Sequence, residues 1–455
     1  MNFSERKLLD LQSYIDYLEK EQQLVRVKSE VDAVHELAGV ASQFEGGKTI
    51  LFENVEDSDY PLLIGLYWNR DLIARFFETS SEQLPFLLKD AIRQGQQSPM
   101  EPLISKQGPA NEVIEKEVDL YQLPIPHHAE GDGGRYLTSS VVIAKDPDTG
   151  VRNVSVHRMM LTGKDRMTIQ LEEYGHLMDY YKRAEAKGQA LELTVSNGID
   201  FAVCMAAAAP ESSSPIDTDE LGIASQIRGA PVELIEAQTV NVEAIANAQF
   251  VIEGRILPGI REPEGPYAEV TGYYALREPR WVFEATAITR REKPIFHSIL
   301  SGLEVRNAFA TITEAGIFEK VNAQVPSVKA VKLSEGAIPY YLVLQVEKNE
   351  EGVQLEAIKA ALSSQAFIKM VTVVDTDVDI FNPAEVEWAV ATRCRFEQDL
   401  VFINDAPGHR LNPTTEDDRW TQVGIDATVP LPVEEKYVKA RMQQVNLDDY
   451  DIEGI

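Results

Sequence analysis

The stretch from Arg261 to Tyr274 combines acidic residues with a rigid turn, a combination that could transfer protons. It reads R-E-P-E-G-P-Y-A-E-V-T-G-Y-Y, with acids at Glu262, Glu264 and Glu269. Proline fixes φ and glycine permits positive φ, so the Pro-Glu-Gly-Pro turn should hold the flanking carboxylates on stiff backbone. Crowding and burial can push the pKa values of two carboxyls apart, which suits acid–base catalysis. An acidic surface turn is the alternative interpretation.

Beyond this turn the chain alternates between two sets of side chains. One set is Ala268, Val270 and Gly272, and the other is Glu269, Thr271 and Tyr273. Such alternation predicts a strand that points Glu269 to one defined face.

A second group of polar residues lies in the sequence N-V-S-V-H-R from Asn153 to Arg158. As a strand, this segment would place Asn153, Ser155 and His157 on one face and Arg158 on the other. An arginine among apolar strand residues needs a carboxylate or phosphate partner, because an unpaired buried charge is costly. The two acids beside the Gly-Pro turn could supply that partner. An edge-strand arginine exposed to water is the alternative.

Two more polar residues lie near predicted helix starts. His176 follows Glu-Tyr-Gly, and Glu220 lies where a first-turn glutamate would complement a helix dipole. A single histidine at such a position is more often structural than a ligand, and the spacing alone gives no metal signature.

The composition limits the class of protein. A chain of 455 residues with 44% hydrophobic and 25% charged residues should form two or three globular domains. Its 43 basic and 73 acidic residues give a net charge of −30, which would repel nucleic acid and anionic membranes. The two cysteines, Cys204 and Cys394, give no disulfide framework, and we expect both to be packing residues in apolar, strand-like segments. A polar N-terminus without a long apolar run predicts a cytoplasmic protein.

The N-terminal region alternates helices and strands, which predicts an α/β domain. The predicted helices are Leu8–Leu24, Asp32–Phe44 with Asp32 as N-cap, Asn69–Phe77 and Glu82–Arg93. The predicted strands are Val25–Val27, Thr49–Asn54 and Leu62–Leu66. The segment Gln94–Asn111, rich in Gln, Gly, Ser and Pro, is predicted to be a linker.

From about Val113 to Ser301 many short strands indicate a barrel or a sandwich. They are Tyr136–Ala144, Val151–Met160, Met167–Leu171, Leu191–Val195, Phe201–Ala206, Phe250–Ile256, Trp281–Arg290 and Ile295–Leu300, with helices at His176–Ala186 and Asp217–Arg228. Helix and strand then alternate over Ile317–Asn322, Tyr340–Val346, Leu355–Ala361, Ile368–Val374 and Pro383–Thr392. A last helix is predicted at Val433–Val445, beside the acidic tail Asp448–Glu453.

Four of these segments resemble motifs of the UbiD family of reversible decarboxylases, which use prenylated flavin mononucleotide (prFMN). E-G-P-Y-A-E-V-T-G-Y-Y from Glu264 resembles the family signature, and N-x-S-x-x-R from Asn153, followed by His176, resembles its cofactor segment. Glu220 ahead of Q-I-R-G-A-P resembles the E…LRGEP element. V-D-T-D-V-D-I-F-N-P-A-E-V-E-W-A-V-A-T-R from Val374 resembles the C-terminal signature. The likeness covers nearly the whole chain.

The resemblance implies a cofactor site. Asn153, His176 and Glu220 match the family's ligands for Mn²⁺ or Mg²⁺, which clamps the flavin phosphate, and such donors suit a hard divalent cation. The residues implied to line the flavin are Ser155, Val156, His157, Arg158, Gln170 and Gly175. A potassium ion near the same phosphate is also implied.

The resemblance also implies catalytic roles. Arg158, Glu264 and Glu269 match the family's Glu-Arg-Glu network. Loss of CO₂ from an sp² carbon leaves a carbanion, for which the cofactor acts as electron sink. Glu269 would deliver the replacing proton, while Glu264 and Arg158 orient it and bind the substrate carboxylate.

Three positions bear on the substrate or depart from the family. Gln422 stands where many bacterial members have lysine, which weakens any phosphate or lid contact there. His297 and Arg306 could bind a second polar group of a dicarboxylate or heteroaromatic acid, and a structural histidine is the alternative for His297.

These observations together predict an N-terminal α/β domain (1–112), a central split β-barrel that binds prFMN (113–310) and a C-terminal α/β domain with oligomerisation and terminal helix (311–455). The expected function is reversible, non-oxidative decarboxylation of an aromatic, heteroaromatic or α,β-unsaturated carboxylic acid. Alternatives are a polyprenyl-hydroxybenzoate decarboxylase of quinone biosynthesis, a non-catalytic scaffold subunit, and a hydrolase using the paired glutamates. Expected partners are further copies of the chain, as a homodimer or larger, and a flavin prenyltransferase that supplies the cofactor.

Overall fold

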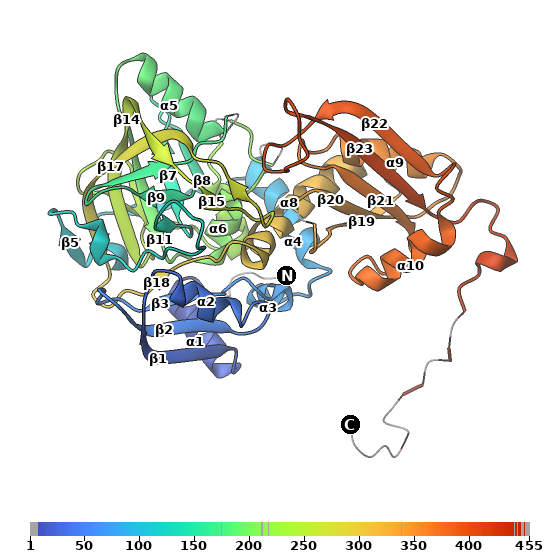
Figure 1. Ribbon diagram of the computed structural model, residues 1–455, viewed down its shortest axis with the longest axis horizontal. Coiled ribbons are helices and arrows are strands. Elements are labelled where there is room, and N and C mark those ends of the chain that lie inside the picture. The colour runs from blue at the N-terminus through green and yellow to red at the C-terminus, as the bar shows by residue number, and fades with distance from the viewer. Residues whose placement is uncertain are drawn as a thin grey trace.

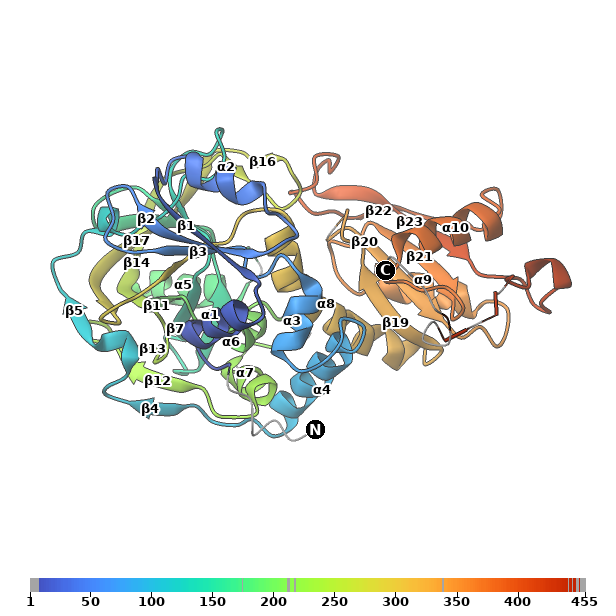
Figure 2. The same ribbon diagram turned by 90° about the horizontal axis from the view of Figure 1, so that it is seen from below.

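Three main sheets follow one another along the chain, and Figure 1 shows them as an N-terminal layer, a curled central body and a C-terminal lobe. The computed structural model describes residues 8–173, 175–210, 213–216, 218–337, 339–440, 442–443, 445–446 and 450. Helix α8 (Leu303–Gln324) runs between the body and the lobe, and Figure 2 shows the same separation from below. The predicted fold class, a central split β-barrel between two α/β regions, is confirmed, and the barrel is a curled, half-closed sheet.

The N-terminal sheet has the order β1-β2-β3-β18. Its strands are β1 (Leu24–Val31), β2 (Thr49–Val55), β3 (Leu62–Ile64) and β18 (Phe296–His297), and its helices are α1 (Leu11–Lys20), α2 (Glu36–Ser42), α3 (Arg70–Phe76) and α4 (Leu84–Gln97). Strand β18 comes from the far end of the central region and pairs in parallel with β3. This pairing ties the central body to the N-terminal layer.

Two predictions for this region are wrong. Asp32 does not cap α2, because its carboxylate accepts from the Val34 N–H (2.7 Å) and the helix begins only after His35. The segment Gln94–Asn111 is not a linker. It completes α4 and then forms β4 (Leu103–Ser105), which pairs in parallel with β12. Strand β4 is exposed along its length, which accounts for the polar composition around it.

The central sheet follows the path β6-β9-β10-β17-β14-β11-β7-β8, with β5 pairing β17. Its strands are β5 (Val113–Glu115), β6 (Tyr136–Leu137), β7 (Val141–Lys145), β8 (Arg152–Val156), β9 (Met159–Leu161), β10 (Arg166–Ile169), β11 (Leu191–Asn197), β14 (Phe250–Glu264) and β17 (Glu278–Arg290). The smaller strands β12 (Glu233–Glu236) and β13 (Glu243–Ile245) form a sheet with β4. The body also carries α5 (His176–Ala186), α6 (Phe201–Ala207) and α7 (Leu221–Arg228). The long β14–β17 hairpin extends beyond the sheet and carries Glu264 at its end.

Two predicted strands are not strands. Phe201–Ala206 forms α6, in which all seven residues are buried, so no polar face marks the helical period. Cys204 is therefore a buried helix residue, whereas Cys394 is partly buried, and both are free. The strand predicted over 268–274 is a hairpin of β15 (Tyr267–Ala268) and β16 (Tyr274–Ala275). Its turn closes where the Gly272 N–H donates to the Glu269 carbonyl at 2.9 Å.

The C-terminal lobe has a five-stranded sheet in the order β19-β20-β21-β23-β22. Its elements are β19 (Val328–Leu333), β20 (Tyr341–Val346), α9 (Val353–Leu362), β21 (Met370–Asp375), α10 (Pro383–Arg393), β22 (Leu400–Pro407) and β23 (Arg419–Ala427). The helix predicted at Val433–Val445 is wrong. Its described residues contain only the 3-10 turn η4 (Glu435–Tyr437), and its apolar side chains remain exposed instead of covering a core. Most of the predicted acidic tail, and Asp217 at the predicted start of α7, lie outside the described residues. No helix in the described part of the chain is long and apolar enough to span a membrane.

Candidate active site

Arg158 forms ion pairs with both Glu264 and Glu269. Its Nε and Nη2 donate to the two oxygens of Glu264, each at 3.2 Å, and its Nη1 donates to Oε1 of Glu269. The three residues come from the connection between β8 and β9, the end of β14 and the hairpin turn after β15. The side chains of Glu264, Glu269 and Arg158 are 1%, 11% and 14% exposed, so the exposed-arginine and acidic-surface-turn alternatives are wrong. The predicted convergence of these residues is confirmed.

Two tyrosines complete the surroundings of this ion-pair cluster. The Tyr136 hydroxyl donates to Oε1 of Glu264 at 2.9 Å, and the Arg158 guanidinium lies 4.8 Å from the centroid of the Tyr267 ring. Burial raises the pKa of Tyr267 to about 12, so its hydroxyl stays protonated. Sequence reasoning gave neither tyrosine a role. Tyr267 lies inside the recognised motif, whereas Tyr136 is distant in sequence and its local sequence carried no signal.

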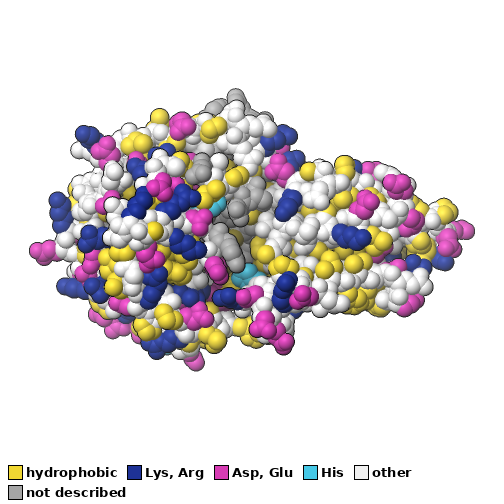
Figure 3. All heavy atoms as spheres, turned by 90° about the horizontal axis from the view of Figure 1, so that it is seen from above, with side chains coloured by type: hydrophobic (Ala, Val, Ile, Leu, Met, Phe, Trp, Pro, Cys, Tyr) yellow, Lys and Arg dark blue, Asp and Glu magenta, His cyan; other side chains and the backbone are white. Residues whose placement is uncertain are grey.

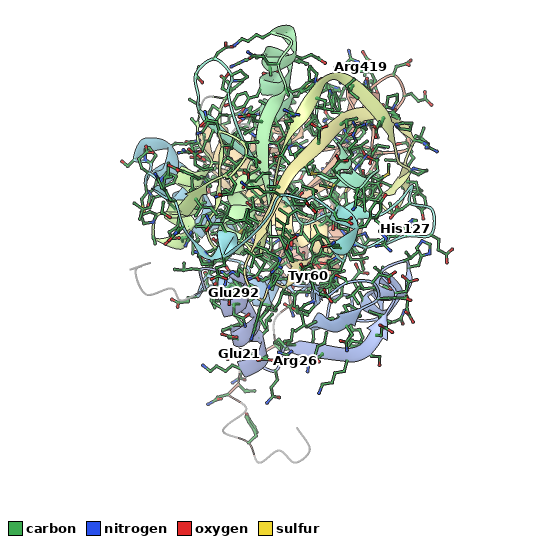
Figure 4. All side chains as sticks on the ribbon, turned by 90° about the vertical axis from the view of Figure 1, so that its left-hand side faces the viewer. Glu21, Arg26, Tyr60, His127, Glu292 and Arg419 are labelled. Atoms are coloured by element: carbon green, nitrogen blue, oxygen red, sulfur yellow. The ribbon has the colours of Figure 1, made fainter. Side chains whose placement is uncertain are left out.

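The backbone around the hairpin is held by a close contact. The Gly133 N–H donates to the Pro266 carbonyl at 2.7 Å, and a Cβ on Gly133 would lie 2.2 Å from the Gly265 carbonyl oxygen. Oδ1 of Asp132 accepts from the Ala268 N–H at 2.7 Å. Figure 4 labels His127, whose Nε2 lies 3.0 Å from the Asp132 carbonyl oxygen. The loop that contains Asp132 and Gly133 therefore fixes the turn that carries Glu269.

A cavity of about 320 Å³ lies along β8 and the start of α5. Asn153, His176 and Glu220 all line it, and Nδ1 of His176 lies 3.7 Å from Oε1 of Glu220. Glu220 also accepts from the Val154 N–H at 2.8 Å and the Ser214 hydroxyl at 3.0 Å. Burial raises the pKa of Glu220, and the contacts with His176, the Val154 N–H and Ser214 partly offset that effect.

The donor set of this cavity fits a hard divalent cation. The Asn153 amide nitrogen donates to Ser155 Oγ at 2.8 Å, which leaves its oxygen for a cation. An amide oxygen, an imidazole and a carboxylate leave further coordination positions for ligand oxygens, as Mn²⁺ and Mg²⁺ require. In the described ranges, no group of three or more His, Cys, Asp or Glu side chains could hold a metal by itself. An ion here would therefore depend on Asn153 and on a ligand such as a phosphate.

The other residues predicted to line a flavin divide into two groups. Ser155, Val156, His157 and Gly175 line the cavity, whereas Arg158 does not. Ser155 Oγ lies 2.9 Å from Nε2 of His157, so the two share a face with Asn153 as predicted. Gln170 does not line this cavity, although its carbonyl oxygen lies 2.7 Å from Nδ1 of His157. The cavity is also lined by residues to which the sequence assigned no role, namely Met178, Ala207, Ala208, Ala209 and Phe309.

A second cavity, the interdomain cleft, has a volume of about 700 Å³. It is lined by the Glu269 hairpin, by Ser301 and Arg306 near the start of α8, and by Tyr340 and Lys369 of the C-terminal lobe. Figure 3 shows the molecule hollowed between the body and the lobe. The cleft lies beside Glu269 and is open to a small molecule.

The residues predicted to bind substrate separate in the structure. Arg306 lines the interdomain cleft, whereas His297 lines neither cavity and is 1% exposed. Nδ1 of His297 lies 2.6 Å from Ser139 Oγ, and burial lowers the pKa of His297 to about 3, which keeps it neutral. These contacts favour the structural interpretation. Gln422 is also structural, because its amide donates to the Leu362 and Ile368 carbonyls.

The geometry does not support a hydrolase. A paired acid and nucleophile need two carboxyls facing a saccharide cleft. Here both oxygens of Glu264 are held by Arg158, and Glu264 is buried behind it.

Family models match most of the chain. They are the N-terminal domain of 3-octaprenyl-4-hydroxybenzoate carboxy-lyase (UbiD) at residues 15–92, its Rift-related domain at 102–304 and its C-terminal domain at 307–427. Among curated proteins, an uncharacterised protein of the cooM 5′ region of Rhodospirillum rubrum is 44% identical over 99% of this chain and 98% of its own. The anhydromevalonate phosphate decarboxylase of Methanothermobacter thermautotrophicus is 34% identical over 93% and 98%.

A solved structure has the same architecture. The UbiD-class enzyme HmfF from Pelotomaculum thermopropionicum, in complex with FMN, is 39% identical, with a TM-score of 0.92 over 97% of this chain and 99% of its own. An evolved dimeric form of that enzyme is in complex with prFMN. Similar curated proteins include the anhydromevalonate phosphate decarboxylase above and a gallate decarboxylase of Lactiplantibacillus plantarum, and the chain matches the whole length of the fold. It therefore belongs to the UbiD family and is a carboxy-lyase of that family.

Proposed function

We propose that the chain is a reversible, non-oxidative decarboxylase of an aromatic, heteroaromatic or α,β-unsaturated carboxylic acid, with prFMN as its cofactor. The observation that carries the proposal is the cluster in which Arg158 binds both Glu264 and Glu269 at the edge of the interdomain cleft. HmfF is 39% identical in sequence, and its structures are in complex with FMN and, in an evolved dimeric form, with prFMN. This similarity supports the choice of cofactor. When bound, prFMN supplies an electron sink for the carbon that loses CO₂.

The protein's own part of the reaction is positioning and proton transfer. Glu269 lies at the cleft and, in its protonated form, delivers a proton to the carbon that CO₂ has left, which leaves Glu269 as the carboxylate that pairs with Arg158. Arg158 orients Glu269 through Nη1, and Glu264 holds Arg158 with two further hydrogen bonds. A bidentate pair fixes the plane of the guanidinium, so the carboxyl of Glu269 is held in one orientation.

The test is Glu269→Gln in protein co-expressed with a flavin prenyltransferase. We expect turnover to fall by at least about 10²–10⁴-fold, the usual contribution of general acid catalysis. Glu262→Gln is the matched control, since this half-buried acid lies in the same motif and pairs only loosely with Arg166, at 3.5 Å. CO₂ release and deuterium exchange into the product in D₂O are measured. Near-wild-type rates in Glu269→Gln would reject the proposal.

We also propose that Asn153, His176 and Glu220 hold Mn²⁺ or Mg²⁺ against the flavin phosphate, with K⁺ nearby. Their position in one cavity and their donor chemistry support this. Glu220→Gln and chelation by EDTA should both reduce the flavin retained after gel filtration, which flavin absorbance measures. Full retention of flavin in metal-free protein would contradict the assignment.

A homodimer or larger assembly through the C-terminal region is proposed as well. The exposed apolar side chains there support it, since Phe402 is 61% and Val438 69% exposed. Light scattering of the purified chain tests the assembly, and a monomeric mass would overturn it.

A further inference from the structure

An ion pair lies next to the cavity of Asn153, His176 and Glu220 and takes no part in the proposed proton transfer. Arg152 precedes Asn153 in sequence and Asp219 precedes Glu220, yet neither Arg152 nor Asp219 lines the cavity. Nε of Arg152 donates to Oδ2 of Asp219 at 2.7 Å, and Nη2 of Arg152 lies 2.7 Å from the same oxygen. The two side chains are 16% and 23% exposed, so the pair is largely withdrawn from water.

Asp219 joins the start of helix α7 to strand β8. Its Oδ1 accepts from the Leu221 N–H at 3.0 Å, while its Oδ2 accepts from Arg152. Glu220, the next residue, also reaches β8, because its Oε2 accepts from the Val154 N–H at 2.8 Å. Two consecutive acids therefore hold the same strand at two points.

These two points lie on either side of Asn153 in the sequence of β8. Alternate residues of a strand point to opposite faces, so Arg152 can be held without entering the cavity that Asn153 lines. A shift of β8 against α7 would change the separation of the Asn153 oxygen and the Glu220 carboxylate. An ion shared by these two residues depends on that separation, as metal ligands depend on the contacts that orient them.

A further acid supports Arg152 from strand β13. Oε2 of Glu243 lies 3.7 Å from Nη1 of Arg152, and Oε1 of Glu243 accepts from Nζ of Lys145 at 2.7 Å. The Glu243 side chain is also mostly buried. Arg152 thus lies between two carboxylates, and its planar guanidinium is held in one orientation.

We propose that the ion pair of Arg152 and Asp219 positions the metal site, by setting the separation of Asn153 and Glu220 and with it the affinity for the divalent ion and the flavin phosphate. This rests on the proposed function and adds to it how the ligands are held. Arg152 and Asp219 are positioning residues, since neither lines the cavity. A pair with a structural role alone would contribute to stability and leave the metal dependence of flavin binding unchanged.

The test is calorimetric titration of the flavin-free chain with FMN, once with MnCl₂ and once with EDTA. We expect the unmodified chain to bind FMN more tightly with Mn²⁺. Arg152→Met should lower the affinity in Mn²⁺ by about 10- to 100-fold, the usual effect of losing a group that supports a metal ligand, and leave the affinity in EDTA unchanged. Arg152→Lys keeps a cation opposite Asp219 and should recover part of the loss.

Asp219→Asn separates the two contacts of Asp219. The asparagine oxygen still accepts from the Leu221 N–H, whereas its amide nitrogen cannot accept from Arg152. We expect the same loss as in Arg152→Met, and little further loss when both substitutions are combined, because both remove one interaction. Arg290→Met on β17 is the matched control, since Arg290 is 17% exposed and pairs with Glu115 at 2.8 Å. It should retain the full effect of Mn²⁺.

Three results would contradict the inference. An unchanged effect of Mn²⁺ in Arg152→Met and Asp219→Asn would overturn the positioning role and leave the metal assignment standing. An equal loss of affinity in Mn²⁺ and in EDTA would show that the pair acts only on the fold, which the thermal midpoints of the variants would also report. FMN binding that does not respond to Mn²⁺ in the unmodified chain would instead contradict the metal assignment of the proposed function, and the positioning role with it.

Discussion

Arg158 donates hydrogen bonds to two carboxylates, Glu264 and Glu269, and these contacts limit how its guanidinium can move. Glu264 receives two hydrogen bonds from Arg158 and one from Tyr136, so its buried charge is compensated on several sides. Nε of Arg280 lies 3.8 Å from the same carboxylate. Glu264 therefore acts as an anchor for Arg158, while Glu269, also bound by Arg158, lines the cleft.

Tyr136→Phe tests this anchor. The variant removes one hydrogen bond to Glu264 at 2.9 Å and keeps the ring that packs against Tyr267. Because one such bond contributes about 1–2 kcal/mol, we expect turnover to fall about 5- to 30-fold with little change in thermal midpoint. Tyr121→Phe on the exposed surface is the control. Unchanged turnover in Tyr136→Phe would mean that Arg158 alone orients the acids.

His128 gives a prediction for the pH dependence of stability. Burial lowers its pKa to about 4, with a smaller effect of His127, whereas an unfolded histidine titrates near 6.5. Between these values the unfolded chain binds a proton that the folded chain does not, so the free energy of unfolding falls as pH falls. His128→Asn should reduce that slope by up to about 1.4 kcal/mol per pH unit.

Urea unfolding between pH 7 and pH 4.5 measures this slope. Above pH 7 the variant and the unmodified chain should depend on pH alike, which serves as the control. Burial also lowers the pKa of His297, to about 3, so the free energy of unfolding of the variant should still fall with pH, but less steeply. Identical slopes below pH 6 would show that His128 does not contribute.

At the scale of elements, the hairpin that carries Glu269 depends on the loop packed against it. Gly133→Ala would place a Cβ 2.2 Å from the Gly265 carbonyl, whereas a Cβ on Gly134 would meet only Met160, at 3.5 Å. The first substitution must displace the hairpin, and a displacement of about 1 Å can cost about 10²-fold in rate. We expect Gly133→Ala to lose turnover and Gly134→Ala to retain it. Kinetics and circular dichroism of both variants check this, and equal turnover would contradict the role of the contact.

Helices α5 and α6 show where a helical period in the sequence does and does not predict a helix. Helix α5 was predicted with its observed bounds, because charged and apolar residues alternate with a helical period. Helix α6 is buried on all sides, and the sequence therefore predicted a strand there. Asp200, whose carboxylate accepts from the Val203 N–H at 3.2 Å, was the signal that could have corrected it. The hairpin after Pro266 was missed because a short turn and an alternating strand share the same pattern.

The candidate site was predictable only where chemistry is concentrated in motifs. Glu264 and Glu269 lie close in sequence, but their meeting with Arg158 depends on the path of the long β14–β17 hairpin. Tyr340 and Lys369 reach the cleft from a separate lobe, so no local pattern marks them. Residues of this kind can be assigned to the cleft only from the three-dimensional structure.

At the scale of the whole molecule, one buried ion pair joins the N-terminal layer, helix α8 and the C-terminal lobe. Arg70 on α3 of the N-terminal layer donates through both Nη atoms to Glu314 on α8. Oε1 of Glu314 also accepts from the Leu333 N–H at 2.9 Å, at the end of β19 in the C-terminal lobe. Both charged side chains are buried, so each depends on the other for compensation.

Removing one partner of this junction should cost more than removing both. Arg70→Met leaves Glu314 buried without its counter-charge, and we expect a loss of about 3–5 kcal/mol in the free energy of unfolding. Arg70→Met with Glu314→Met removes both charges and should be less destabilised than the sum of the single variants. Lys329→Met on β19 is the control, since its exposed pair with Glu347 should contribute at most about 1 kcal/mol. Denaturant unfolding gives the free energies of the unmodified chain, the two single variants, the double variant and the control. Hydrogen exchange over residues 328–333 reports whether the C-terminal lobe loosens first. Additive losses, or unchanged exchange in Arg70→Met, would show that the lobe is held by apolar packing along α8 instead.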